Sequence, residues 1–341
     1  MTFDNTTELS VLERAVESGD PGATCELGWR FEHGKGGVEK DERRAFKLYL
    51  RAAELDDPVA LNQVGLCYSD GIGVKRDRAT ACRYYRKSAE RGYAPAQNNF
   101  GWMYLTGDGV KQSDKAAARW FKKSAEQGHT QALNNLGFCY LRGAGVPQDV
   151  EEANRCFQKA FDDGLLEAAV NLAANYMSGA GFKVDYKRAA ELLEKAAEAE
   201  IPSALTNLGY LYKNGLGVEQ NGERAFSLLK RAADQKFAAA YPFLAECYEY
   251  GIGTPADRDH AMSYYKLASL SGNRSAAARY AALSSSAPST KLNDLLSSVG
   301  RQAEERVDFS VGAALEVRGA QERIAAKKEE LRRRKEEGKG E

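Results

Sequence analysis

A 36-residue period constrains the fold of this chain more than any other feature of its sequence. Glycine recurs at positions 65, 101, 137 and 209, and alanine fills positions 173 and 245 of the same series. A pair of glycines follows as GIGV at 71–74, GDGV at 107–110, GAGV at 143–146, GAGF at 179–182, GLGV at 215–218 and GIGT at 251–254. An earlier copy, GWRFEHGKGGV at 28–38, fits with one inserted residue, so the chain holds seven copies. Such self-similarity is the signature of a repeat architecture.

Each copy predicts a first helix that ends in a glycine turn. In the third copy, Ala96, Phe100, Gly101 and Tyr104 have the i, i+4, i+5, i+8 spacing of one buried helical face. The first glycine of each pair can adopt the left-handed conformation that satisfies the last helical carbonyls. A phosphate-binding loop would follow a strand and occur once, whereas this turn follows a helix in every copy. We therefore assign a structural role to the turn glycines Gly71, Gly107, Gly143, Gly215 and Gly251.

Three further columns predict a second helix in each copy. The residues expected to cap its start are Asp41, Asp77, Ser113, Asp149, Asp185, Asn221 and Asp257. A column of alanine without exception follows, from Ala45 to Ala261, and four residues later comes a bulky column from Tyr49 to Tyr265. Short helices need neighbours to bury their apolar faces. We expect an all-α fold, a right-handed α/α superhelical solenoid of about seven 36-residue helix-turn-helix repeats plus C-terminal helices.

The flanking segments complete the predicted organisation. We expect an N-terminal capping helix in 1–21, the seven repeats in 22–272, C-terminal capping helices in 273–300 and a charged helical tail in 301–341. In the tail, Val317, Ile324 and Leu331 recur every seven residues among Lys, Arg and Glu. Three interpretations stay open for it: a solvated charged helix, a coiled coil with a partner or with a second copy of the chain, and a nuclear-import or nucleic-acid signal in the cluster Arg332-Arg333-Arg334-Lys335, which glutamates flank.

The copy AQNNFGWMYLTGDGVKQSDKAAARWFKKSAEQGH, residues 96–129, resembles a Sel1-like repeat, a slightly longer relative of the tetratricopeptide repeat. The resemblance covers residues 8–283 and implies adaptor or scaffold proteins that assemble complexes, with no common reaction. A secreted branch of that family places a disulfide where this chain has pairs such as Ala89 and Ala96. Because the N-terminus also lacks the features of a secretory signal, we expect reduced thiols, a cytoplasmic location and no transmembrane segment.

By analogy with tetratricopeptide arrays, the first helices should line a concave groove. The position after the helix glycine carries aromatic or apolar side chains in several copies, and the position three residues before it carries Asn. Such a surface suits an extended peptide or another protein. The candidate partner-binding residues are Trp29, Asn62, Leu66, Asn98, Trp102, Asn134, Phe138 and Tyr210. The alternative is that these columns pack against the neighbouring first helix.

Composition argues against several other functions. Lys+Arg and Asp+Glu both number 48, so the zero net charge gives no bias toward nucleic acid. Six cysteines and three histidines lack zinc-site spacing, and we predict no metal and no cofactor. We predict a non-catalytic adaptor, with two rivals. One is a regulatory subunit that embraces a folded enzyme through its convex face or C-terminal helices. The other is a hydrolase of peptide or cell-wall material, for which no nucleophile–base pair is evident.

Overall fold

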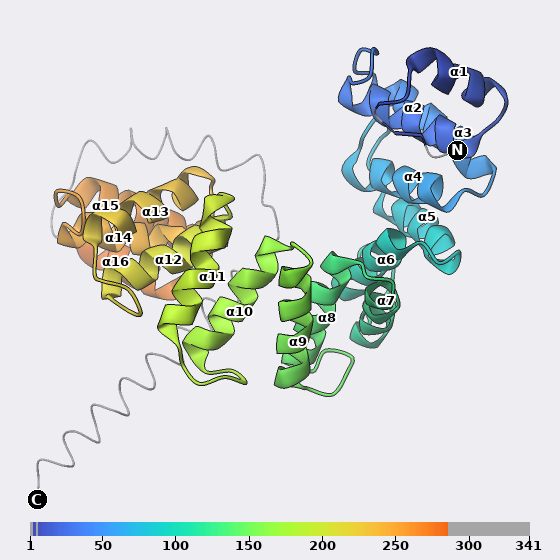
Figure 1. Ribbon diagram of the computed structural model, residues 1–341. Coiled ribbons are helices and arrows are strands. Elements are labelled where there is room, and N and C mark those ends of the chain that lie inside the picture. Colours follow the sequence, from blue (N-terminus) through green and yellow to red (C-terminus); the bar gives the residue numbers. More distant parts are fainter. Residues whose placement is uncertain (1–2, 5, 286–341) are drawn as a thin grey trace, which may run out of the picture. The chain divides into compact units, whose positions relative to one another are not determined.

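The computed structural model describes residues 3–4 and 6–285, and every regular element in this part of the chain is a helix (Figure 1). The first helices of the repeats are α2 (Pro21–His33), α4 (Pro58–Asp70), α6 (Ala94–Thr106), α8 (Thr130–Arg142), α10 (Leu166–Ser178), α12 (Pro202–Asn214) and α14 (Tyr241–Tyr250). The second helices are α3 (Glu42–Glu54), α5 (Arg78–Glu90), α7 (Asp114–Glu126), α9 (Val150–Asp162), α11 (Tyr186–Glu198), α13 (Gly222–Asp234) and α15 (Arg258–Leu270). Helices α1 (Leu9–Glu17) and α16 (Arg274–Ser284) flank them. The helices expected beyond residue 285 lie outside the described residues.

The last repeat begins differently from the others. Its first helix is preceded by a 3₁₀ turn, η1 (Ala238–Ala240), where the other repeats have a regular α-helical start. Pro242 has no N–H with which to donate to the carbonyl of residue 238. The α-helical ladder therefore cannot run unbroken through this turn.

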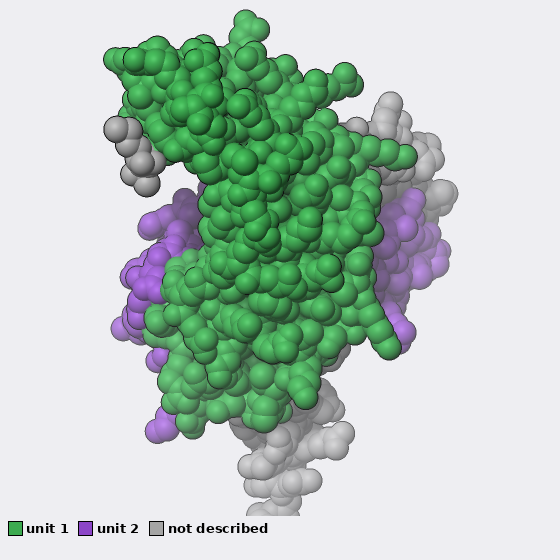
Figure 2. All heavy atoms as spheres, turned by 90° about the vertical axis from the view of Figure 1, so that its right-hand side faces the viewer, with its two compact units in different colours: residues 1–160 green, residues 161–341 purple. Residues whose placement is uncertain are grey.

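The chain forms two compact units, residues 1–160 and residues 161–341, which Figure 2 distinguishes by colour. In the first unit α2, α4 and α6 pack on α3, α5 and α7 of their own repeats, and α3, α5 and α7 pack in turn on α4, α6 and α8. In the second unit the same alternation joins α10 through α16. The predicted solenoid of consecutive helix pairs is therefore confirmed.

The second helices begin where the sequence predicts. The side chain of Asp41 accepts a hydrogen bond from the backbone N–H of Arg44 at 2.9 Å. The corresponding residue accepts such a bond in all six of the remaining repeats. Asp41 also donates its own backbone N–H to the carbonyl of Phe31 in the first helix, at 2.7 Å. Equivalent bonds close the turn in the later repeats. Each turn is thus held to both of the helices that it joins.

Helix pairs interlock through the glycine and bulky columns. A Cβ atom added to Gly101 would lie 2.8 Å from the ring of Phe121, and one added to Gly65 or Gly137 would meet Tyr85 or Phe157 at 2.7 Å. The ring of the second helix therefore fills the space that the missing side chain leaves on the first helix. Phe121 and the alanine four residues before it, Ala117, are fully buried. This is why the two columns recur together.

The paired glycines of each turn have different tasks. The first glycine, such as Gly71, has φ of +83° and donates its N–H to the carbonyl of Cys67, and Ile72 donates to the same carbonyl. This is the left-handed helix end expected from the sequence. The second glycine approaches the preceding repeat. A Cβ atom on Gly145 would lie 2.2 Å from the carbonyl oxygen of Asp114, at the start of α7.

Two alanine substitutions separate backbone strain from this contact between repeats. Gly92 has φ of +88° with nothing within 4 Å of an added Cβ, whereas Gly145 has φ of +74° and the close backbone neighbour. We expect Gly92→Ala to cost about 1 kcal/mol of unfolding free energy. Gly145→Ala should cost about 3 kcal/mol or more, because repeat 4 must also shift from repeat 3. Urea unfolding followed by circular dichroism measures both, and equal losses would contradict the contact role.

The N-cap of α8 predicts a pH dependence. His129 accepts the backbone N–H of Ala132 on Nδ1 at 3.3 Å, which requires that nitrogen to be unprotonated. Burial lowers the pKa of His129 below its ordinary value of 6.5. The unfolded chain therefore binds a proton on His129 more readily than the folded chain does. The stability that this capping bond supplies is fully present above about pH 6.5 and is lost as the pH falls below that value.

The matched variant is His129→Asn, which keeps a capping side chain but does not titrate. Between pH 7.5 and pH 5, we expect the urea midpoint of the unchanged protein to fall further than that of the variant. Parallel midpoints across this range would show that His129 does not carry the effect.

Candidate protein-binding face

The first helices of unit 1 align four predicted site residues along one face. Trp29, Leu66, Trp102 and Phe138 each follow the helix glycine that receives a ring from the second helix, so they occupy the same position of four consecutive repeats. All four are half-buried. We call this set the aromatic stripe. Its members are accessible to a partner while part of each side chain is fixed by the protein.

Neighbouring side chains hold the stripe in place. The ring of Trp29 stacks on His33 with centroids 4.6 Å apart, and His33 itself is oriented by a bond of 2.9 Å between its Nδ1 and the carbonyl oxygen of Trp29. Phe138 packs edge-on against Phe157 at 5.3 Å, and Leu66 packs against the core of repeats 2 and 3. Such contacts reduce the rotamer entropy that binding would cost.

The asparagine column lies deeper than the stripe. Asn62, Asn98 and Asn134 are 4%, 8% and 5% exposed. Asn62 Oδ1 accepts from Asn99 Nδ2 at 3.0 Å, and Asn98 Oδ1 accepts from Asn135 Nδ2 at 2.9 Å. These amides therefore bond the first helices of successive repeats to one another. This is the alternative in which the column packs against the neighbouring first helix instead of lining a groove. Asn99, which sequence reasoning passed over, is the half-buried member of this pairing.

Tyr210, the remaining predicted site residue, lies in unit 2 and has different surroundings. It is half-buried, and its ring packs edge-on against Phe243 of the next repeat at 5.6 Å. The same position holds buried Ala174 in repeat 5 and Glu246 in repeat 7, and Glu246 pairs with Lys213. The apolar character of the stripe does not continue through the repeats of this unit.

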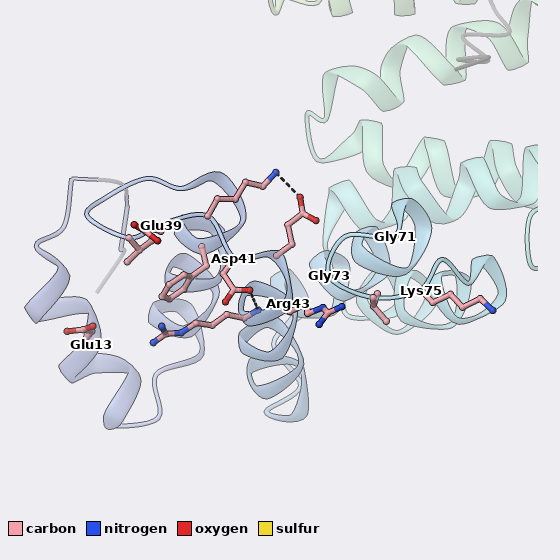
Figure 3. A pocket seen from close by; sticks show the side chains of 13 residues that line it. Glu13, Glu39, Asp41, Arg43, Gly71, Gly73 and Lys75 are labelled. Atoms are coloured by element: carbon pink, nitrogen blue, oxygen red, sulfur yellow. Dashed lines mark hydrogen bonds and ion pairs between the residues drawn. The ribbon is translucent and has the colours of Figure 1, made fainter. Parts of the chain in front are cut away.

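A surface hollow in unit 1 lies beside the start of α3, and no residue of the stripe lines it (Figure 3). Its lining includes Lys40, Glu42, Asp41 and Arg44. Lys40 pairs with Glu42 at 2.7 Å, Asp41 caps the helix, and Arg44 lies over the ring of Phe31. The lining contains no Ser, Cys or His, so the hollow holds no Ser–His or Cys–His pair.

The six cysteines are free thiols and all are buried. Burial raises the pKa of Cys67 and Cys139 to about 12, and that of Cys247 to about 11. These thiols therefore stay protonated near neutral pH and are poor nucleophiles. Among the described residues no group of three His, Cys, Asp or Glu side chains is placed to hold a metal ion. None of the described helices is long and apolar enough to cross a membrane.

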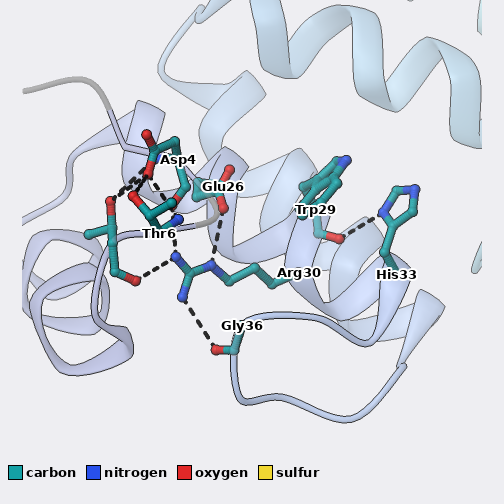
Figure 4. A network of polar contacts seen from close by, with 8 residues as sticks. Asp4, Thr6, Glu26, Trp29, Arg30, His33 and Gly36 are labelled. Carbon is teal, nitrogen blue, oxygen red and sulfur yellow. Dashed lines mark hydrogen bonds and ion pairs between the residues drawn. The ribbon is translucent and has the colours of Figure 1, made fainter.

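The open end of unit 1 is closed by a buried arginine (Figure 4). Arg30 is 1% exposed, and its guanidinium donates to the carbonyls of Thr7 at 2.6 Å, Asp4 at 2.8 Å and Gly36 at 3.3 Å. It also pairs with Glu26 at 3.0 Å. The equivalent positions of repeats 2 to 4 hold Cys67, Met103 and Cys139, which are buried. In repeat 1, Arg30 instead binds the N-terminal segment through the carbonyls of Asp4 and Thr7.

The stacked helix pairs and the repeated turns between them define the class of the protein, an α-solenoid of helix-turn-helix repeats. The Sel1 repeat model matches residues 21–57, 58–93, 94–129, 130–165, 166–200, 202–237 and 238–273. The chain belongs to the Sel1 repeat family. This fold is typical of protein-interaction scaffolds.

Two solved structures illustrate the likeness. A protective antigen present in uropathogenic Escherichia coli strains, which displays an SLR fold, is 30% identical with a TM-score of 0.62 over 90% of this chain. The chain spans 65% of the length of that protein. A Sel1 repeat protein from Oxalobacter formigenes is 26% identical with a TM-score of 0.65, over 72% of this chain and 96% of its own. The comparison with curated proteins found no match.

Replacing Arg30 by the apolar residue of an internal repeat tests its capping role. Arg30→Met leaves the carbonyls of Asp4, Thr7 and Gly36 without their donor, and we expect a loss of about 3 kcal/mol. Amide hydrogen exchange across α1 should accelerate more than exchange in α6. The control is Arg14→Met on the exposed side of α1, which should change neither measurement. Unchanged exchange in α1 of Arg30→Met would contradict the assignment.

Proposed function

We propose that this chain is a non-catalytic scaffold that binds an extended segment of a partner protein along the aromatic stripe of unit 1. One observation carries the proposal: four successive repeats present a half-buried Trp, Leu, Trp and Phe at the same position of the first helix. Trp is the residue type most enriched among interaction hot spots. An extended peptide can place successive side chains against such a series.

Polar groups beside the stripe support an extended ligand. Asn99 donates its amide to Asn62, and its Oδ1 accepts no hydrogen bond from any residue that the structure describes. This oxygen, three residues before Trp102 on the same helix, is suited to accept a backbone N–H of a peptide. We therefore assign peptide contact to the stripe and Asn99, and inter-repeat bonding to Asn62 and Asn98.

The location that we propose is the cytoplasm. All six cysteines are free thiols, which is the usual state in a reducing compartment. A reducing compartment also fits a scaffold whose core contains cysteine at Cys67, Cys139 and Cys247, where oxidation would disturb the packing.

The binding face can be tested with peptides selected against the protein itself. Extended peptides are selected by display on the full chain, and their dissociation constants are measured by fluorescence anisotropy. We expect Trp102→Ala and Phe138→Ala each to weaken binding by about tenfold or more, the effect of removing a hot spot.

Leu55→Ala is the control, because Leu55 is an exposed apolar residue outside the stripe, with 56% exposure. It should leave affinity within about twofold. Circular dichroism melts verify that the variants fold. Selected peptides that bind Trp102→Ala and Phe138→Ala as tightly as the unchanged chain would refute the proposed face.

A further inference from the structure

The second helices of repeats 1 to 3 carry an unusual excess of positive charge. Helices α3, α5 and α7 together contain twelve Lys or Arg and five Asp or Glu residues, whereas α11, α13 and α15 contain eight and six. The excess is concentrated at the second, sixth and tenth positions of each helix. The residues at these positions are Arg43, Lys47 and Arg51 on α3, Arg83 and Lys87 on α5, and Lys115, Arg119 and Lys123 on α7. Ala79 alone interrupts the pattern.

We call these eight residues the cationic grid. Positions four residues apart on a helix lie on one side, about 6 Å apart. Successive second helices begin beside one another, because Gly73, in the turn before α5, contacts the Glu42 carbonyl of α3, and Gly109 contacts the Arg78 carbonyl of α5. Figure 1 shows α3, α5 and α7 following one another along unit 1. The grid is therefore one continuous surface, with rows about 10–12 Å apart, the width of a helix.

The grid is exposed, and its side chains are not held in ion pairs within the described chain, although Arg83 is close enough to Asp77 to add to the hydrogen bonds from Thr80 that lower the pKa of that carboxyl. All eight side chains are exposed, and none forms an ion pair with a described residue. Arg51 donates to the carbonyl of Val16, and Arg83 donates to the Thr80 hydroxyl. The twelve corresponding positions of α9, α11, α13 and α15 are mixed in charge, with five cations and the four acidic residues Glu151, Glu191, Glu223 and Asp259. Like charges held this close repel one another, and an anionic partner would relieve the repulsion.

The surroundings of the grid favour a protein partner over other polyanions. A surface for single-stranded nucleic acid stacks bases on exposed aromatic rings, but Lys87 and Lys123 lie over Tyr84 and Trp120, at 5.6 and 4.7 Å from the ring centroids. Helices that bind membranes usually add large apolar side chains. The exposed large apolar residues of the described chain all lie outside α3, α5 and α7: Leu55, Val59, Val184, Tyr250 and Leu270.

We propose that the cationic grid is a second docking surface, separate from the aromatic stripe, and that it binds an acidic helical segment of a partner protein. Carboxylates four residues apart on a helix repeat at the same spacing of about 6 Å as the cations along each row. Arg43, Arg51, Arg83 and Arg119 can each form a forked bond with a carboxylate. This proposal goes beyond the proposed function, because the grid lies on the second helix of each repeat whereas the stripe lies on the first.

A labelled acidic peptide of about 20 residues with Glu at every fourth position is the probe, with fluorescence anisotropy on the full chain. We expect binding at about 50 mM salt that weakens steeply by about 300 mM. Arg83→Glu with Arg119→Glu should weaken it at least tenfold. The control is Lys187→Glu with Lys195→Glu, an equal charge change at the second and tenth positions of α11 in unit 2, which should change it less than twofold.

Each other outcome overturns the proposal. Absence of binding, or equal loss in the two double variants, removes the grid as a docking surface. Tighter grid-dependent binding of a DNA duplex of about 20 base pairs, or of vesicles containing phosphatidylserine, would replace the acidic protein with that polyanion. Trp102→Ala should bind the acidic peptide normally, so failure of the stripe and failure of the grid are distinguishable. Circular dichroism establishes that both double variants fold.

Discussion

In repeats 2, 3, 4, 6 and 7, a close backbone contact at the second glycine of the turn fixes the repeat against the preceding one. Gly73, Gly109 and Gly145 in unit 1, and Gly217 and Gly253 in unit 2, all place their backbone against the first residues of the preceding second helix. A side chain cannot fit there, since a Cβ atom would lie within 2.0 to 2.6 Å of that backbone. At these five turns the spacing between repeats is therefore limited by main-chain atoms rather than by side chains. Side chains elsewhere can vary without changing the stack.

The buried amides add a polar bond to this spacing. In unit 1, Asn62 and Asn98 each bond to an asparagine of the next repeat, at 3.0 and 2.9 Å. A buried amide without a partner is costly. A repeat that slid or rotated would therefore lose this hydrogen bond as well as buried packing area. Asn62 and Asn98 lie one helical turn before Leu66 and Trp102 and are more deeply buried, so the helices that carry these two stripe residues are bonded to the helix of the next repeat. Preorganisation of the stripe follows from this arrangement.

The sequence predicted the fold well because each column had a local physical reason. The N-cap of Asp41, the left-handed turn at Gly71 and the buried alanine at Ala45 depend on residues nearby in the chain, and all are found where expected. Contacts between repeats were harder to predict. Nothing local indicates that Gly145 touches Asp114, or that Asn98 faces Asn135 rather than solvent. Whether a given helix position faces the next repeat or solvent can be decided only when the rotation between repeats is known.

The same limit explains why the charged surface was missed. The net charge of zero is a sum over the whole chain. It would argue against polyanionic partners only if the charges were evenly distributed over the surface. The repeats instead hold the invariant positions inside and leave the outward positions of the second helices unconstrained by packing. Cations gather there in α3, α5 and α7, whereas the same positions in later repeats hold a mixture of acidic, basic and neutral residues. In a repeat protein the informative quantity is therefore the charge at each outward position of successive repeats. The columns that vary between repeats, rather than those that define the family, can distinguish the partners of one solenoid from those of another.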